Sequence, residues 1–214
     1  MKRQRKAGRS EPAGAAPSRG FSRRDLLRGA GVVAAGGAVL GTAAVAFARE
    51  AEADLVVQGP GAVDLVLKVN GEPKKVSVEP RETLLDVLRL PIDLTGAKRA
   101  CDRGSCGACT VLVDGLAVNA CMLLAVDCAG HEVTTAEGVA KGRGAALVDS
   151  FVRRDAMQCG FCTPGMLVSC AAAVSAHGKG LTEAQARAAT AGNLCRCVTY
   201  PHVLLAALVA ARAG

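Results

Sequence analysis

The sequence predicts an α+β protein with two small domains, a β-grasp followed by a bundle of four helices. Three observations support this prediction. Residues 63–138 alternate between hydrophobic and polar residues around turn signals, which is typical of strands. From residue 145 the spacing of hydrophobic residues becomes that of helices. Eight of the ten cysteines fall into two groups of four, one group in each predicted domain.

Residues 1–48 are predicted to be a twin-arginine signal peptide. Ser22-Arg23-Arg24-Asp25-Leu26-Leu27-Arg28 resembles the twin-arginine export signal, and the mildly apolar run after it ends in the small-x-small site Ala46-Phe47-Ala48. A retained membrane anchor is the alternative, because the run is about long enough to span a bilayer. This leader predicts that the protein is exported to the periplasm and that the twin-arginine export machinery is one of its partners. Because that route carries folded proteins, it disfavours a disulfide framework for the cysteines.

The excess positive charge belongs to this leader. Residues 1–48 hold nine of the 26 Lys and Arg but two of the 19 Asp and Glu, so the remaining 17 basic and 17 acidic residues cancel. No basic stripe interleaved with aromatic residues follows, so no nucleic-acid partner is expected. The chain is poor in aromatic residues, with one Tyr, four Phe and no Trp, so its core is expected to consist of Ala, Val and Leu. Bound metal could stabilise such a core.

After a linker at residues 49–62, the first domain (residues 63–138) reads as strand, hairpin, strand and helix. Strands are predicted at residues 64–69 and 74–78, joined by Asn70-Gly71, a strong hairpin signal. A helix follows with Thr83 as its N-cap. The remaining strands are predicted at residues 111–113, 117–126 and 132–135, after which the chain leaves the sheet.

Four cysteines of this domain have the plant-type [2Fe–2S] spacing, C-x4-C-x2-C with a fourth cysteine further on. Two irons bridged by two sulfides need four thiolates from a tight loop whose backbone N–H groups turn inward. Gly104 and Gly107 permit such a loop. A structural zinc site is the alternative, but zinc usually takes two C-x2-C knuckles. The set consists of Cys101, Cys106, Cys109 and Cys121.

The second domain (residues 139–214) is predicted to hold four helices and the second cysteine set. Thiols from two loops beside helix ends can enclose one cluster, and helix N-termini stabilise thiolates. On spacing alone, zinc or a redox-active C-x2-C pair stays open, although no βαβ pattern supports a thioredoxin-like fold. The helices are expected at residues 145–154, from Thr163-Pro164 to about residue 176, from Thr182, and at 201–212. The set consists of Cys159, Cys162, Cys195 and Cys197.

Three stretches follow one another in the body: Cys101-Asp-Arg-Gly-Ser-Cys-Gly-Ala-Cys-Thr-Val, Gln158-Cys-Gly-Phe-Cys-Thr-Pro-Gly and Gly192-Asn-Leu-Cys-Arg-Cys. Together they resemble the two-cluster iron–sulfur domains of the molybdenum hydroxylases, the xanthine dehydrogenase and aldehyde oxidoreductase family. The resemblance implies a plant-ferredoxin-like first domain with an outer [2Fe–2S] cluster on the first set. It implies a four-helix second domain with an inner [2Fe–2S] cluster on the second set. Val198 departs from the family, which usually has a small residue there.

The resemblance also implies a function and partners. In the family, the glutamine before the first inner-cluster cysteine and the last inner-cluster cysteine contact the pterin of the molybdenum cofactor. Those positions are Gln158 and Cys197 here. Since the sequence contains no flavin domain and no large molybdenum-binding domain, the chain is expected to be the iron–sulfur subunit of an oxidoreductase complex, with no catalytic side chain and no substrate site.

This subunit is expected to relay electrons from the molybdenum–pterin centre of a large partner to a flavin subunit, a cytochrome or another acceptor. The substrate oxidised by the partner is expected to be an aldehyde or an N-heterocycle, and the leader makes the chain most similar to periplasmic aldehyde oxidoreductase subunits. A free-standing two-cluster ferredoxin-like carrier is the alternative, and a binding module held by zinc or disulfides is a third. Cys128 and Cys170 are expected to be small buried hydrophobic residues on a strand and a helix.

Overall fold

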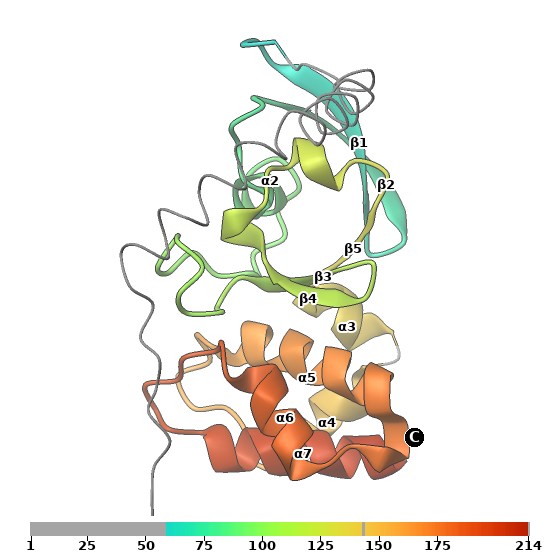
Figure 1. The fold of residues 1–214 in the computed structure, drawn as a ribbon, viewed down its shortest axis with the longest axis vertical. Helices are drawn as coiled ribbons and strands as arrows, with labels where there is room; N and C mark the ends of the chain where they lie inside the picture. Colours follow the sequence, from blue (N-terminus) through green and yellow to red (C-terminus); the bar gives the residue numbers. More distant parts are fainter. Residues whose placement is uncertain (1–58, 143, 214) are drawn as a thin grey trace, which may run out of the picture. The chain divides into compact units, whose positions relative to one another are not determined.

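The computed structural model describes residues 59–142 and 144–213, so the predicted signal peptide and most of the predicted linker lie outside the described residues. The described chain forms a five-stranded sheet with one short helix, followed by a set of helices (Figure 1). The predicted α+β class, with a sheet domain before a helical domain, is therefore confirmed. Within the described ranges, no helix is both long and apolar enough to cross a bilayer.

The sheet begins with the predicted hairpin of β1 (Val63–Val69) and β2 (Glu72–Val78). At its turn Asn70 and Gly71 have φ values of 54° and 83°, the two positive angles that a type I′ turn requires. The strand order is β2-β1-β5-β3-β4. The short strand β5 (Glu132–Thr134) runs parallel to β1 and antiparallel to β3 (Thr110–Val113), so it joins the hairpin to the rest of the sheet.

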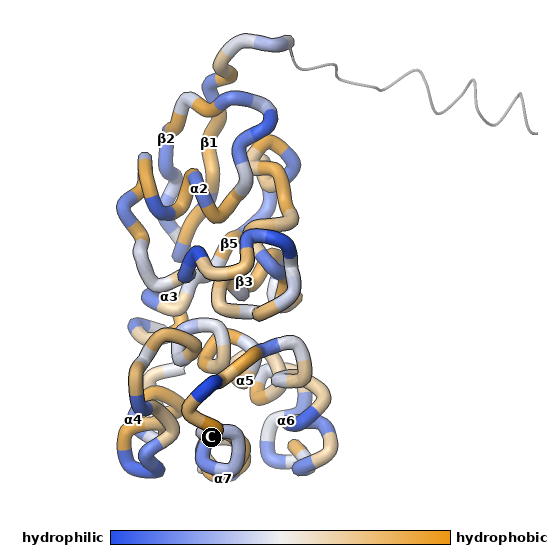
Figure 2. The backbone as a smooth tube through the Cα atoms, turned by 90° about the vertical axis from the view of Figure 1, so that its left-hand side faces the viewer, coloured by the Kyte–Doolittle hydropathy of each residue, from blue (hydrophilic) through white to orange (hydrophobic). Residues whose placement is uncertain are grey.

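Helix α2 (Leu84–Arg89) covers the core of the sheet domain. Thr83 is its N-cap, as predicted, because its side chain accepts a hydrogen bond of 3.2 Å from the Asp86 backbone N–H. Four of its six residues are buried and pack with residues of the sheet. Figure 2 shows hydrophobic residues in both domains, in line with a separate core for each.

The strand predicted at residues 117–126 is wrong beyond residue 119. Strand β4 ends there (Leu116–Asn119), and Cys121 lies in a 3₁₀ turn, η2 (Ala120–Met122). Cys128 was also misplaced, since it is buried in a second turn, η3 (Val126–Cys128), and not on a strand. The turns bring the chain back to the start of α2, where the Leu84 N–H donates to Leu123 O (2.8 Å). A strand continuing beside β3 could not make that bond.

The helical domain contains the four expected helices: α4 (Ala145–Arg153), α5 (Thr163–His177), α6 (Glu183–Thr190) and α7 (Tyr200–Ala213). Cys170 is buried on α5, as expected. A further helix, α3 (Ala136–Lys141), occupies residues that were predicted only to leave the sheet. It is six residues long and contains Gly138, which disfavours helix. Packing of Ala136 and Val139 into the helical core stabilises it instead.

Helix α5 links the two domains. It packs against β3 of the sheet on one side and against α6 and α7 on the other (Figure 1). Its buried residues include Met166 and Val168, which share a core with Phe151 of α4 and Val203 of α7. Cys109 and Cys121 of the first set flank β3 and β4, which α5 contacts, and Cys162 of the second set lies at the start of α5, so its packing decides how close the sets come.

Candidate functional site

The first four cysteines come together in two pairs. The thiols of Cys101 and Cys106 lie within hydrogen-bonding reach of each other, and so do those of Cys109 and Cys121. The Arg103 backbone N–H and the Cys106 thiol lower the pKa of Cys101 to about 7. Burial raises the pKa of Cys109 to about 12. Because the thiolate is the metal-binding form of cysteine, this set can offer iron a thiolate near neutral pH.

Backbone N–H groups of the loop point at sulfur, as a cluster requires. The Gly104 N–H donates to Cys121 Sγ (3.2 Å) and the Ser105 N–H donates to Cys101 Sγ (3.3 Å). Gly104 has a φ of 71°, which favours glycine. A Cβ there would lie 2.9 Å from Met122 Cγ, on the turn that carries Cys121. The glycine therefore serves both the loop conformation and the approach of the fourth cysteine.

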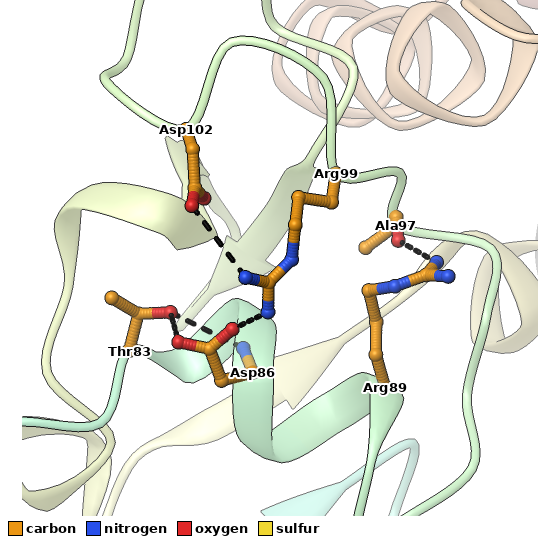
Figure 3. A network of polar contacts seen from close by, with 6 residues as sticks. All are labelled: Thr83, Asp86, Arg89, Ala97, Arg99 and Asp102. Atoms are coloured by element: carbon orange, nitrogen blue, oxygen red, sulfur yellow. Dashed lines mark hydrogen bonds and ion pairs between the residues drawn. The ribbon is translucent and has the colours of Figure 1, made fainter.

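Two arginines tie this loop to α2 (Figure 3). Arg99 forms ion pairs with Asp86 of α2 and with Asp102 (3.6 Å), the residue after the first cysteine. Arg89, the last residue of α2, donates a hydrogen bond to Ala97 O (2.8 Å). Because α2 is anchored by its buried face, these contacts hold the chain segment that leads into the first cysteine.

The second set is brought together around the start of α5. Cys162 is the N-cap of α5, its thiol lies within hydrogen-bonding reach of Cys195, and Cys159 is near. Burial and the Cys195 thiol raise the pKa of Cys162 to about 12. Burial also acts to raise the pKa of Cys195, but hydrogen bonds with Thr199, the Cys162 thiol and the Cys197 backbone together lower it to about 7. The backbone N–H of Cys197 donates a hydrogen bond to the Cys195 thiol.

The pairing of thiols fits a two-iron cluster, in which each iron takes two cysteines. Within residues 59–142 and 144–213, no three His, Cys, Asp or Glu side chains form a compact group of the kind that holds a single metal ion. The contacts between thiols are pairwise in both sets, Cys101 with Cys106 and Cys109 with Cys121 in the first, and Cys162 with Cys195 in the second. Cys128 and Cys170 lie outside both sets, and burial raises the pKa of each, to about 12 for Cys170. They are buried hydrophobic residues, as expected.

The surface beside the second set is exposed and partly apolar. Gln158, the first predicted pterin contact, is exposed next to this set. Phe161, Leu194 and Val198 keep 49%, 60% and 68% of their surface exposed. Val198 follows Cys197, the second predicted contact, and has a φ of 60°. A β-branched residue rarely adopts that conformation, which is a physical reason for a small residue at this position in the family.

A buried asparagine that the sequence did not single out joins the two sets. Asn193 precedes Cys195 by two residues, and its Nδ2 donates to Gly107 O of the first loop (2.9 Å). Only 4% of Asn193 is exposed. The sole signal for it in the sequence is its place in the third cysteine-rich stretch. Its partner lies 86 residues away, so no local pattern could reveal the contact.

Comparison with known families and proteins identifies both domains. A model described as "2Fe-2S iron-sulfur cluster binding domain" matches residues 67–133, and one described as "[2Fe-2S] binding domain" matches residues 135–208. The chain is similar to the aldehyde oxidoreductase iron-sulfur-binding subunit PaoA of Escherichia coli (strain K12), with 36% identity over 201 residues that cover 87% of this chain and 86% of that protein. The nicotine 6-hydroxylase small subunit of Paenarthrobacter nicotinovorans is 42% identical over 146 residues, covering 68% and 88%.

Two solved structures are similar to this fold. Quinoline 2-oxidoreductase from Pseudomonas putida 86 matches with a TM-score of 0.65 and 39% identity, over 72% of this chain and 98% of that chain. The aldehyde oxidoreductase from Desulfovibrio gigas matches with a TM-score of 0.64 and 35% identity, over 70% of this chain and 17% of that chain. The second match shows the same fold as one part of a much longer protein.

Proposed function

This chain belongs to the family of two-cluster iron–sulfur subunits of the molybdenum hydroxylases, and we propose on that premise that its two cysteine sets relay electrons from a molybdenum centre on a partner subunit. Each [2Fe–2S] cluster, when bound, supplies storage for one electron. The chain itself holds the ligands, turns backbone N–H groups toward sulfur and sets the separation of the two sites. The ligands we assign are Cys101, Cys106, Cys109 and Cys121 for the outer cluster, and Cys159, Cys162, Cys195 and Cys197 for the inner cluster.

The observation that carries this proposal is a backbone contact between the two loops. The Leu194 N–H donates a hydrogen bond of 2.9 Å to Cys106 O. Cys106 belongs to the outer set, and Leu194 directly precedes Cys195 of the inner set. One hydrogen bond therefore joins the backbone of an outer ligand to the residue directly before an inner ligand. The rate of electron transfer falls steeply with distance, so a short connection between the two sites suits a relay. Two independent structural metal sites would not need such a connection.

Metal analysis of the purified complex tests the function. We expect about four irons per chain with matching sulfide, and two distinguishable EPR signals after reduction. A large molybdenum-containing chain should co-purify. Zinc in place of iron, or oxidised thiols without metal, would contradict the cluster assignment. A full iron content without a molybdenum-containing partner would instead favour a free-standing electron carrier.

We also infer that Gln158 and Cys197 contact the pterin of the partner's cofactor. The exposure of Gln158, and of the apolar side chains of Phe161 and Leu194, which neighbour cysteines of the inner set along the chain, supports this inference, since a docked subunit would cover them. Gln158→Ala is expected to leave both EPR signals unchanged but to slow reduction of the clusters by the substrate of the complex. Lys179→Ala, an exposed position on η4 (Gly178–Gly180), serves as the control. Loss of a cluster signal in Gln158→Ala would make Gln158 a structural residue instead.

Export to the periplasm by the twin-arginine machinery is proposed from the leader. The match to PaoA covers 87% of this chain, more than residues 59–214 make up, so it extends into the N-terminal segment. Replacing both Arg23 and Arg24 by Lys is expected to leave the protein in the cytoplasmic fraction. Unchanged fractionation would contradict this route.

The partner's substrate is proposed to be an aldehyde, because PaoA, whose match covers 87% of this chain, is named an aldehyde oxidoreductase subunit. The nicotine 6-hydroxylase subunit makes N-heterocycles the alternative. Assay of the complex with both substrate classes decides between them. A flavin subunit or a cytochrome is the proposed electron acceptor.

A further inference from the structure

We propose that Asn193 is a positioning residue for electron transfer between the two cluster sites. The inference rests on the proposed function, since it requires that both cysteine sets hold clusters. Asn193 acts through Gly107, which directly follows the outer ligand Cys106. Its buried side chain holds the outer loop against the inner loop and thereby sets the path between the clusters.

The amide of Asn193 uses both of its edges. Nδ2 donates to Gly107 O (2.9 Å) and to Thr110 Oγ1 at the start of β3 (3.3 Å), while Oδ1 accepts from Ser169 Oγ of α5 (2.8 Å). A carbonyl oxygen can only accept, so Gly107 requires the NH₂ edge to face it. The three partners lie on the outer loop, the sheet and α5. The amide is therefore the point at which three elements are locked to the inner loop.

The backbones around Asn193 are in close contact. A Cβ on Gly107 would lie 2.5 Å from Asn193 Nδ2 and 2.6 Å from Gly192 O, and a Cβ on Gly165 of α5 would overlap Gly107 O. The neighbouring bond from Leu194 N to Cys106 O lies beside a side chain that is 60% exposed. Asn193 is buried and bonds to three elements at once. We therefore infer that the side chain of Asn193 is the contact that keeps the outer loop in place against the inner loop.

Removal of the amide should leave the outer loop folded. Gly107 O also accepts hydrogen bonds from Thr110 N (3.2 Å) and Thr110 Oγ1 (2.7 Å), so it stays satisfied without Asn193. The backbone N–H groups at the outer thiols, among them those of Arg103, Gly104 and Ser105, do not include that of Gly107. Asn193→Ala therefore tests the relative position of the sites rather than their assembly.

The experiment uses the intact complex with its molybdenum subunit. For Asn193→Ala we expect unchanged iron content and both EPR signals, a weaker spin–spin interaction between the reduced clusters, and slower reduction of the outer cluster after substrate is added. Ser150→Ala is the matched control, because it removes a buried hydrogen bond to Ala206 O (2.8 Å) within the helical domain. It should behave as the wild type.

Asn193→Asp separates hydrogen bonding from shape. It preserves the outline of the side chain but turns an oxygen toward Gly107 O in place of an N–H, so its transfer should be at least as slow as in Asn193→Ala. An Asp variant with wild-type transfer would overturn the proposal, because shape alone would then suffice.

Two results for Asn193→Ala would also overturn it. One is an unchanged spin–spin interaction and transfer rate in a protein with both clusters, and the other is loss of a cluster signal, which would make Asn193 an assembly residue. In either case a wild type with about four irons leaves the proposed function standing. A wild type without iron would refute the proposed function and this inference together.

Discussion

Replacement of Cys109 by Ser is expected to abolish the outer cluster and leave the inner cluster in place. Cys109 is 2% exposed, and its thiol lies against that of Cys121, so no solvent molecule or second thiol can easily take its place. A serine hydroxyl ionises far less readily than a thiol and is a poor ligand for iron. Iron should fall from about four to about two atoms per chain, and one of the two EPR signals should disappear.

Cys170→Ala is the matched control for this substitution. Cys170 is equally buried, at 1% exposure, but lies on α5 outside both cysteine sets. Its iron content and EPR spectrum should equal those of the wild type. Cys162→Ser should give the reciprocal result, with loss of the other EPR signal. Full iron content in Cys109→Ser, or loss of iron in Cys170→Ala, would contradict the assignment of the two sets.

Gly165→Ala is expected to destabilise the protein, although alanine is the better helix former. In a helix, replacing Gly by Ala ordinarily stabilises by about 0.5–1 kcal/mol. At Gly165 the added methyl group would overlap Gly107 O and lie 3.1 Å from Asn193 Nδ2. The obstacle is backbone of the outer loop, which cannot rotate away as a side chain can. Overpacking of this kind costs about 1–3 kcal/mol, so the net effect should be a lower urea midpoint and a disturbed outer-cluster EPR signal.

Gly192→Ala provides the comparison. It lies in the inner loop next to Asn193, but a Cβ there would meet no atom within 4 Å. Its stability should stay within about 0.5 kcal/mol of the wild type, as for an ordinary surface substitution. If Gly165→Ala were as stable as Gly192→Ala, α5 would be able to move away from the outer loop without cost. The close packing of the two domains would then not control the distance between the clusters.

Much of the local structure was predictable because its causes lie within a few residues. Asn70-Gly71 specifies a type I′ turn through two positive φ angles, and both are present. Thr83 caps its helix through its side chain, as predicted, and the helix expected from Thr182 begins there with the same kind of cap. The cysteine spacing likewise places the outer set in one loop. Each of these features depends on conformational preferences that neighbouring residues express wherever the segment lies.

The parts of the local structure that were predicted wrongly or missed share a different cause. Residues 117–126 alternate well enough for one strand, but the chain leaves the sheet at residue 119 because bonds to the start of α2 stabilise two 3₁₀ turns. Helix α3 was not expected because Gly138 weakens its local pattern, while packing against the helical core supports it. In both places a contact with a distant element outweighs the preference of the local sequence.

The sequence by itself determined the class of the fold, the two sets of thiols and the family, because spacing within loops and the order of motifs along the chain are local properties. The tertiary structure decided how the two sets are joined. The hydrogen bonds from Leu194 N to Cys106 O and from Asn193 to Gly107 O exist because α5 packs its Gly165 directly on the outer loop. Contacts over such separations depend on the packing of whole elements, and no pattern in the neighbouring residues encodes them.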